Sequence, residues 1–260
     1  MKKREKIIRE TRELIKQLKK FNLPKGRFLI YGSGVLGIRG LREMNDLDVI
    51  VEASFYKKLL KKYREYLKEN PKALANNGRT IKIGRFELGV SPPYLNFKKA
   101  KKEADVFFGI KFVSLRDLIF CKKKMKRKKD LRDIQIIKKF VEGLKIFPKK
   151  SKKGVFLVVK DEKKTVGICF LRAENEVGEL KISIKKEYRG IGLGKRLLRE
   201  ALKRAKKELK LKILRVFLSP KDKISQDFFQ KFGFKKVAKV SKKSKKEGKF
   251  SREILMIKKL

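Results

Sequence analysis

Apolar residues at helical spacing open the chain. Ile7, Ile8, Leu14, Ile15 and Leu18 would share one face of a helix over residues 5–20, and the pattern stops before Asn22, Pro24 and Gly26, so a first helix is expected. Strand-like apolar runs follow at 28–31 and 47–51, then a helical pattern over 56–67, a turn at 76–78 and strand segments at 80–83 and 86–88. Ser114 and Asp130 are placed to begin two further helices. This first part predicts a mixed sheet with helices.

The second part has more strands. Their alternating patterns cover 155–160, 165–172, 177–184, 212–218, 234–240 and 252–258, with helical patterns over 192–208 and 222–231. Between the two parts, residues 143–154 contain Gly143, Pro148 and the basic run 149–153, which is the composition of a linker. We therefore expect an α/β (α+β) protein with two domains, 1–145 and 146–260. The second domain should have a mixed, mostly antiparallel sheet with flanking helices.

Composition narrows the function classes. A length of 260 residues suits two domains of roughly 100–150 residues each. The apolar runs are strand-sized and the basic start lacks the apolar segment of a secretory signal, so we expect a cytoplasmic protein without a membrane span. The two cysteines lack metal-ligand spacing, and histidine is absent. These facts argue against a disulfide framework, a zinc site and catalysis by Ser-His or Cys-His pairs.

The charge points to anionic partners. Lys and Arg total 76 against 28 Asp and Glu, a formal charge of +48, which attracts RNA, nucleotides or coenzyme A. RNA is thus a possible partner by charge. The alternative is a compositional bias, since lysine is spread along the whole chain. Aromatic residues do not interleave with basic ones in any recognised RNA-binding pattern.

A glycine-bearing loop lies between a strand and a helix in the second part. Residues 179–184 alternate in polarity, residues 189–194 read Arg-Gly-Ile-Gly-Leu-Gly, and Leu197, Leu198, Ala201 and Ala205 form a helical stripe. Glycines let a loop approach a pyrophosphate closely, and the first amides of the helix would point at it. A dinucleotide-binding turn would look similar, but the acidic residue that it needs after the next strand is missing.

This region resembles the GNAT superfamily of N-acetyltransferases. Arg189, Gly192 and Gly194 match its pyrophosphate signature, and the segment from Asp222 to Phe234 resembles its second signature. The resemblance covers about 155–258 and implies an acetyl-CoA-dependent N-acetyltransferase with an amine acceptor. The residues implied to bind acetyl-CoA are Ile184, Arg189, Gly190, Gly192, Leu193, Gly194 and Asp222.

Three departures from the family bear on catalysis and on acceptor binding. Phe229 stands where many members have a tyrosine that protonates the leaving thiolate, and Asp222 stands where many have an asparagine. Lys160–Lys164 is a short turn where the family places acceptor-binding helices. The amine must also lose a proton, which a carboxylate could accept. Glu179 is the first candidate base and Glu187 the second. For each, an exposed structural charge is the alternative interpretation.

A set of carboxylates marks the first part. Gly32 and Ser33 precede Asp46 and Asp48, which lie two apart on a strand and so share a face. Adjacent carboxylates repel unless a cation lies between them, and Mg²⁺ accepts such oxygen ligands together with nucleotide phosphates. Glu87, on another strand, could supply a third ligand. The alternatives are that Asp46 caps a strand end and that Asp48 pairs with a lysine.

This pattern resembles the polymerase-beta-type nucleotidyltransferase superfamily. The downstream segments 112–119 and 129–134 resemble the helical part of its small stand-alone members. The resemblance covers about 25–140 and implies nucleotide binding at Gly32 and Ser33, Mg²⁺ at Asp46, Asp48 and Glu87, and a nucleoside triphosphate substrate. The alternative is a non-catalytic nucleotide-binding or RNA-binding module, or a regulatory partner in a toxin-antitoxin-like fusion.

Overall fold

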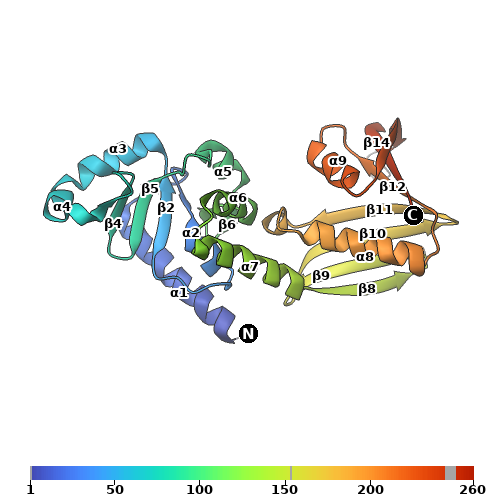
Figure 1. The fold of residues 1–260 in the computed structure, drawn as a ribbon, viewed down its shortest axis with the longest axis horizontal. Helices are drawn as coiled ribbons and strands as arrows, with labels where there is room; N and C mark the ends of the chain where they lie inside the picture. The colour runs from blue at the N-terminus through green and yellow to red at the C-terminus, as the bar shows by residue number, and fades with distance from the viewer. Residues whose placement is uncertain (1, 153, 244–249) are drawn as a thin grey trace. The chain divides into compact units, whose positions relative to one another are not determined.

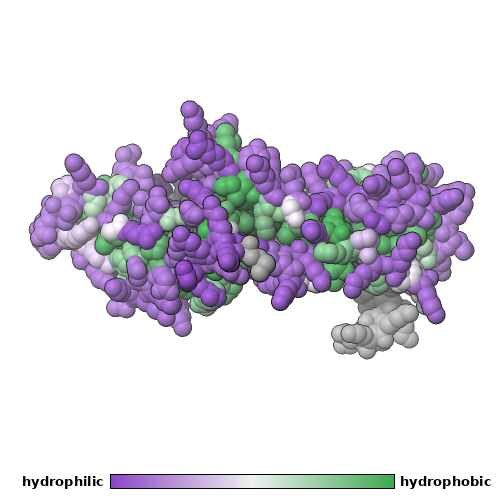
Figure 2. Space-filling view, turned by 90° about the horizontal axis from the view of Figure 1, so that it is seen from below, coloured by the Kyte–Doolittle hydropathy of each residue, from purple (hydrophilic) through white to green (hydrophobic). Residues whose placement is uncertain are grey.

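The computed structural model describes residues 2–152, 154–243 and 250–260 (Figure 1). The chain divides into two compact units. The first holds Met1–Gly143 together with Arg189–Ile191, and the second holds Leu144–Tyr188 and Gly192–Leu260. None of the helices within the described ranges is long and apolar enough to cross a membrane. In the view of Figure 2 the surface is largely hydrophilic, with hydrophobic residues showing in separate patches.

The first unit is built on a seven-stranded mixed sheet of order β3-β4-β5-β2-β1-β7-β6. Its central strands are short and apolar, and several of their side chains are fully buried. The strands are β1 (Phe28–Ile30), β2 (Leu47–Val51), β3 (Leu74–Ala75), β4 (Thr80–Ile83), β5 (Phe86–Val90), β6 (Asp105–Phe107) and β7 (Ile110–Phe112). β2 runs antiparallel to β1 and parallel to β5, and this pairing brings Asp48 opposite Glu87.

The helices of the first unit follow the expected pattern with one interruption. They are α1 (Lys2–Leu18), η1 (Lys19–Phe21), α2 (Gly32–Gly37), α3 (Ala53–Lys62), α4 (Arg64–Glu69), η2 (Pro71–Ala73), α5 (Phe97–Glu103), α6 (Leu115–Met125) and α7 (Lys128–Gly143). The single helix expected over 56–67 is split, because Tyr63 leaves helical geometry between α3 and α4. Ser114 caps α6 as expected, since its side chain accepts a hydrogen bond from the Asp117 N–H.

The second unit is a seven-stranded sheet of order β13-β14-β12-β11-β10-β9-β8. All its strand pairs are antiparallel except β11 with β12. Its elements are β8 (Lys145–Ser151), β9 (Gly154–Asp161), β10 (Lys164–Glu174), β11 (Val177–Ile184), η3 (Lys186–Tyr188), α8 (Leu193–Lys207), β12 (Ile213–Leu218), α9 (Lys223–Gln230), β13 (Lys235–Lys243) and β14 (Phe250–Lys259). The helices and sheet match the mixed, mostly antiparallel architecture expected from the sequence.

The linker expected over 143–154 is wrong. Residues Lys145–Ser151 form β8, which pairs antiparallel with β9 at the edge of the sheet. Edge strands commonly carry lysine and proline, because these residues discourage pairing with another chain. Here Pro148 and the neighbouring lysines belong to such an edge, and an edge strand and a linker share this composition. The division between the units falls between Gly143 and Leu144.

Helix α8 covers one face of the second sheet. A Cβ atom on Gly167 would meet the side chains of Leu193 and Leu197 at 3.6 and 3.2 Å, so these helix residues pack directly on β10. Leu197, Leu198, Ala201 and Ala205 are fully buried on this side. They are the stripe that the helical spacing identified, and their burial positions the start of α8 at the end of β11.

Candidate functional site

The glycine loop of the second unit is open where a ligand phosphate would lie. Gly192 is the N-cap of α8 with φ +101°, a conformation that residues with a Cβ rarely adopt. A Cβ placed on it would meet no atom within 4 Å. The space beside Gly192 is therefore empty of protein, and the first amides of α8 follow it.

Gly194 is required for a different reason. A Cβ on Gly194 would lie 3.3 Å from Cδ1 of Ile184 and 3.6 Å from the ring of Phe228. The helix thus packs closely against the last residue of β11. Phe228 was not singled out from the sequence; it contacts the loop region, whereas Phe229 is buried against Phe228 and Phe234.

The other residues expected to bind acetyl-CoA lie in the same loop, except Asp222, which lies at the start of α9. Gly190 has φ +74°, Arg189 is exposed, and Leu193 is the buried first residue of α8. Asp222 is the N-cap of α9, where its carboxylate accepts hydrogen bonds from the Ser225 N–H at 3.0 Å and hydroxyl at 2.7 Å. That carboxylate is engaged in capping.

Strands β11 and β12 separate beside this loop. They pair only at three positions, of which the last joins Glu179 to Arg215. Both strands continue beyond it, β11 to Ile184 and β12 to Leu218. Residues 180–184 therefore extend past the pairing with β12 and present backbone groups along a diverging edge.

The two candidate bases differ in their surroundings. Glu179 is 14% exposed at the end of the β11–β12 pairing, and its carboxylate lies 3.3 Å from the Lys181 ammonium. Glu187 is half-buried in η3. The hydroxyl of Tyr188 donates a 2.6 Å hydrogen bond to the buried Asp161, so this hydroxyl is already engaged within the unit.

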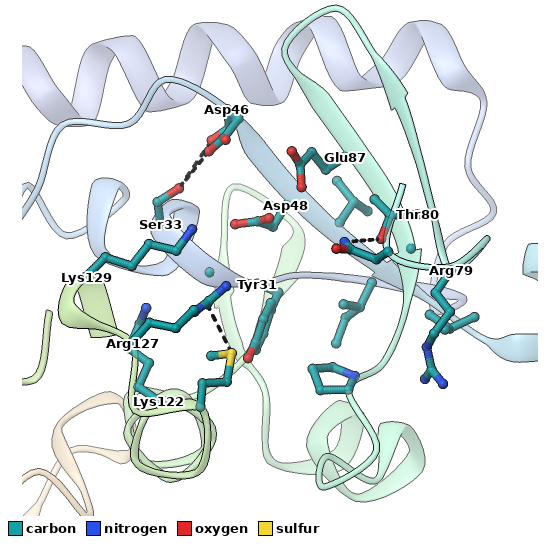
Figure 3. A pocket seen from close by; sticks show the side chains of 18 of the residues that line it. Tyr31, Ser33, Asp46, Asp48, Arg79, Thr80, Glu87, Lys122, Arg127 and Lys129 are labelled. Carbon is teal, nitrogen blue, oxygen red and sulfur yellow. Dashed lines mark hydrogen bonds between the residues drawn. The ribbon is translucent and has the colours of Figure 1, made fainter. Parts of the chain in front are cut away.

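In the first unit the predicted carboxylates face a cavity of about 430 Å³ (Figure 3). Gly32 opens α2 with φ +59°, and a Cβ there would fall 1.8 Å from Oδ2 of Asp48. Only glycine lets that carboxylate lie against the backbone. The Ser33 hydroxyl donates to Oδ1 of Asp46 at 3.4 Å. The Gly-Ser pair and the Asp-x-Asp pair predicted from the sequence are thus brought together.

Asp48 lies in an environment that opposes its charge. Burial, followed by repulsion from Asp46 and Glu87, raises its pKa to about 6, although the Ser33 N–H and Lys129 act in the opposite direction. No ion pair joins Asp48 to a lysine or arginine among the described residues. Glu87, in contrast, forms an ion pair with Lys82 at 2.7 Å.

The three carboxylates line the same cavity, but they are not arranged to coordinate a metal ion. Across residues 2–152, 154–243 and 250–260, no group of three or more His, Cys, Asp or Glu side chains is arranged to hold a metal ion. Figure 3 shows Asp46, Asp48 and Glu87 directed toward a common space. Their oxygen donors suit Mg²⁺, but as they stand Glu87 is turned to Lys82.

Basic side chains form the opposite wall of this cavity. Arg127 and Lys129 face the carboxylates in Figure 3, and Arg79 lies at another edge. These cations were not assigned a role from the sequence. Of these cations, only Lys129 lies in the segment 129–134 of the resemblance described above, and the structure places this segment in the first part of α7.

A buried ionic network supports this wall. The Lys122 ammonium lies 3.2 Å from Asp130 and 2.6 Å from Asp133, with all three side chains almost fully buried. Arg42 donates two hydrogen bonds to Asp133, at 2.7 and 2.8 Å. Arg127 Nε donates to Asp130 at 2.7 Å. The network links the loop before β2 to α6 and α7 and orients Arg127.

The comparisons bear on the second unit. Residues 152–236 match the family model described as an acetyltransferase (GNAT) domain, which confirms the predicted acetyltransferase domain. Searching the curated proteins gives no match.

Solved structures of acetyltransferases resemble less than half of the chain. An acetyltransferase of the GNAT family from Streptococcus pneumoniae is 28% identical with a TM-score of 0.38, over 43% of this chain and 70% of that one. A putative phosphinothricin N-acetyltransferase is 25% identical with a TM-score of 0.37, over 42% and 73%. A ribosomal-protein-alanine N-acetyltransferase from Brucella melitensis is 24% identical with a TM-score of 0.37, over 41% and 69%.

Proposed function

We propose that the acetyltransferase (GNAT) domain at residues 152–236 moves the acetyl group of acetyl-CoA to an amine. The observation that carries this proposal is the open glycine loop at the start of α8, next to the edge of β11 that diverges from β12. The loop and the strand edge would hold different parts of one long ligand.

The pyrophosphate of coenzyme A would bind at the loop. The space beside Gly192 is empty of protein, and the N-terminal amides of the 15-residue helix α8 provide N–H donors and the positive end of the helix dipole. Arg189 adds a cation close by in the sequence. Ile184 and Gly194, which pack together, keep the helix start against β11.

The amide-containing arm of coenzyme A would follow the edge of β11. An extended chain with amide groups can add to an exposed strand edge through main-chain hydrogen bonds. Residues 180–184 offer such an edge beyond the pairing with β12. This arrangement would direct the thioester toward the gap between the two strands.

In the transfer step, the acceptor nitrogen attacks the thioester carbonyl carbon. A C–N bond forms, the C–S bond breaks, the thiolate takes up a proton and the amine gives one up. Glu179 and Glu187 are the candidate acceptors of the amine proton, directly or through water. Phe229 has no proton to donate, and the Tyr188 hydroxyl is bound to Asp161, so water would supply the thiolate proton.

Gly192→Glu tests the assignment. We expect calorimetry to show no acetyl-CoA binding, because an anionic side chain would fill the open space beside the loop. Gly192→Ala is the control for backbone strain, which costs roughly 1–2 kcal/mol where φ is positive, and it should still bind. Gly194 is less suitable, since its side chain would also press on Ile184. Unchanged acetyl-CoA affinity in a folded Gly192→Glu protein would remove the assignment.

A second function is proposed for the first unit, namely binding of a nucleoside triphosphate with Mg²⁺, with nucleotidyl transfer as its further step. The observation that favours it is the half-buried Asp48 carboxylate, which lies among other carboxylates in a cavity that also has basic walls. A divalent ion would relieve the carboxylate repulsion, while Arg127 and Lys129 could receive phosphate oxygens. For Glu87 to take part, it must leave Lys82.

Titration of labelled ATP, with Mg²⁺ and with a chelator, tests this second function. Asp48→Asn should sharply weaken the Mg²⁺-dependent binding and leave acetyl-CoA binding unchanged. The alternative, a non-catalytic nucleotide-binding or RNA-binding module or a regulatory partner, predicts affinity that falls steeply with salt but not with chelation. If ATP binding is equal with and without Mg²⁺, the metal-dependent proposal is wrong.

A further inference from the structure

The sheet of the second unit has one covered face and one open face. Side chains that point toward α8, such as Val159 and Cys169, are 0% exposed. Phe147 on β8 and Ile168 on β10 point to the opposite face and are 41% and 40% exposed. Large apolar residues are therefore accessible on the face opposite α8, against which no helix within the described residues of this unit is recorded as packing.

Strand pairing arranges aromatic and basic residues in a row on this open face. The register places Lys149 opposite Phe156, Phe156 opposite Phe170, and Phe170 opposite Lys181. Directly paired residues of antiparallel strands project to the same side. The two phenylalanine rings stack with centroids 4.3 Å apart and an interplanar angle of 20°, and a lysine lies at each end of the row.

A second row, next to the first, carries Phe147, Val158 and Ile168. The Lys160 ammonium lies 5.8 Å from the centre of the Phe147 ring, within the range of a cation–π contact. The two rows together make a platform of three aromatic rings bordered by cations. We refer to Phe147, Phe156 and Phe170 as the aromatic platform.

Positive charge exceeds negative charge around this platform. On the open face, strands β8–β11 carry five cations and two carboxylates. The cations are Lys145, Lys149, Lys160, Arg172 and Lys181, and the carboxylates are Glu174 and Glu179. Glu179 is paired with Lys181, and Glu174 lies 3.2 Å from Arg215 on β12. Within the described part of the chain, Lys149, Lys160 and Arg172 have no carboxylate at ion-pair distance. They remain available to an anionic ligand.

We propose that this open face binds single-stranded nucleic acid. Unpaired bases of any nucleotide sequence can stack on accessible aromatic rings. The phosphates of the same strand can pair with the surrounding lysines and arginine. A purely apolar partner would leave Lys149, Lys160 and Arg172 buried without counter-charges, which is costly. A polycationic ligand would be repelled. The aromatic platform lies on the face of the sheet opposite α8, and Glu179, a candidate base of the proposed acetyl transfer, borders the same face.

Fluorescence polarisation with a labelled RNA of about 20 nucleotides, with DNA of the same sequence and with an RNA duplex, tests the proposal over a range of salt concentrations. Phe147→Leu keeps an apolar side chain but removes a ring, so we expect single-strand affinity to fall about five-fold or more. The triple variant Lys149→Gln, Lys160→Gln and Arg172→Gln should reduce the slope of log affinity against log salt by about two, or about 0.7 for each lost phosphate contact.

A matched control separates this site from general attraction to a basic protein. Lys203, Lys206 and Lys207 are exposed on α8, so their triple replacement by Gln removes the same charge from the other side of the sheet. We expect this control to bind single strands nearly as well as the wild type. Retained acetyl-CoA binding and circular dichroism verify that each variant is folded, and Phe156→Leu provides a second ring variant.

Three results would overturn the proposal. They are equal losses in the two triple variants, unchanged single-strand affinity in both ring variants, or duplex binding as tight as single-strand binding. A preference for RNA or for DNA would show which nucleic acid the site binds better, and either preference agrees with the proposal. Because acetyl-CoA binding is measured separately, failure here leaves the proposed acetyltransferase function intact.

Discussion

Replacing Asp48 by Asn should stabilise the first unit at neutral pH while removing its proposed metal-dependent ligand binding. An asparagine has nearly the same shape as the aspartate but carries no charge. The free energy of unfolding should therefore rise, because the native state no longer holds an anion that is buried next to Asp46 and Glu87. A gain in stability at the cost of function is typical of residues retained for a ligand.

The pKa of Asp48 sets the size and the pH range of this effect. Its rise from 3.8 to about 6 corresponds to roughly 3 kcal/mol, at about 1.4 kcal/mol for each pH unit. Solvent reaches part of the side chain, so about 1–3 kcal/mol is expected. The sign follows from linkage. Below about pH 3.8 Asp48 is protonated in both states and costs nothing, and the wild type loses this stability as pH rises to about 6.

Urea unfolding followed by tyrosine fluorescence measures the effect in the intact chain. Tryptophan is absent and five of the six tyrosines lie in residues 1–143, so the signal reports mainly on the first unit. We expect wild type and Asp48→Asn to have similar midpoints near pH 4 and the variant to have the higher midpoint at pH 7.5. Added Mg²⁺ should then raise the wild-type midpoint but not that of the variant.

Asp46→Asn provides the matched control, because it removes the same type of charge from an exposed position on the same motif. Its gain at pH 7.5 should be smaller. The reasoning is refuted if Asp48→Asn is less stable than the wild type at pH 7.5, or if its stability difference is the same at both pH values. Either result would mean that the hydrogen bond from the Ser33 N–H outweighs the burial of the charge.

Two further changes probe buried polar groups. Lys122→Met should lower the free energy of unfolding of the first unit by about 3 kcal/mol or more, because it leaves Asp130 and Asp133 without their shared ammonium. Urea unfolding measures this loss. A loss below about 1 kcal/mol would show that Arg42 and Arg127 suffice to compensate the two carboxylates. Tyr188→Phe should destabilise the second unit by about 1–3 kcal/mol through the lost hydrogen bond to Asp161, as measured by thermal unfolding, with acetyl-CoA affinity unchanged. A slower acetyl transfer at unchanged stability would instead give the hydroxyl a role in the reaction.

Local patterns predicted most of the second unit. The alternation of residues 179–184, the glycines at 190, 192 and 194 and the helical stripe after them each depend on near neighbours in the sequence. The structure has β11, the loop and α8 in these places, and the family model covers the same region. In the first unit, Gly32 and Ser33 follow the end of β1, and Asp46 and Asp48 lie at the start of β2. These two positions are adjacent because β1 and β2 are antiparallel.

Features that depend on strand register could not be read from the sequence. Lys149, Phe156, Phe170 and Lys181 are far apart along the chain and become a row only through the pairing of four strands. The expectation that aromatic and basic residues do not interleave is true of the sequence and fails on the sheet. The position of Glu87 is a related case, since pairing of β4 with β5 places Lys82 opposite it.

The carboxylates of this lysine-rich chain differ in whether a lysine or arginine forms an ion pair with them. With 76 basic residues against 28 acidic ones, most carboxylates can find a cation, and a paired carboxylate carries little information about function. Asp130 and Asp133 share Lys122, Glu179 lies against Lys181, and Glu87 lies against Lys82. Asp48 is different, because repulsion from Asp46 and Glu87 adds to its burial. In a chain that offers cations nearly everywhere, a carboxylate without an ion pair inside a cavity supports the proposal that a positive ligand binds there.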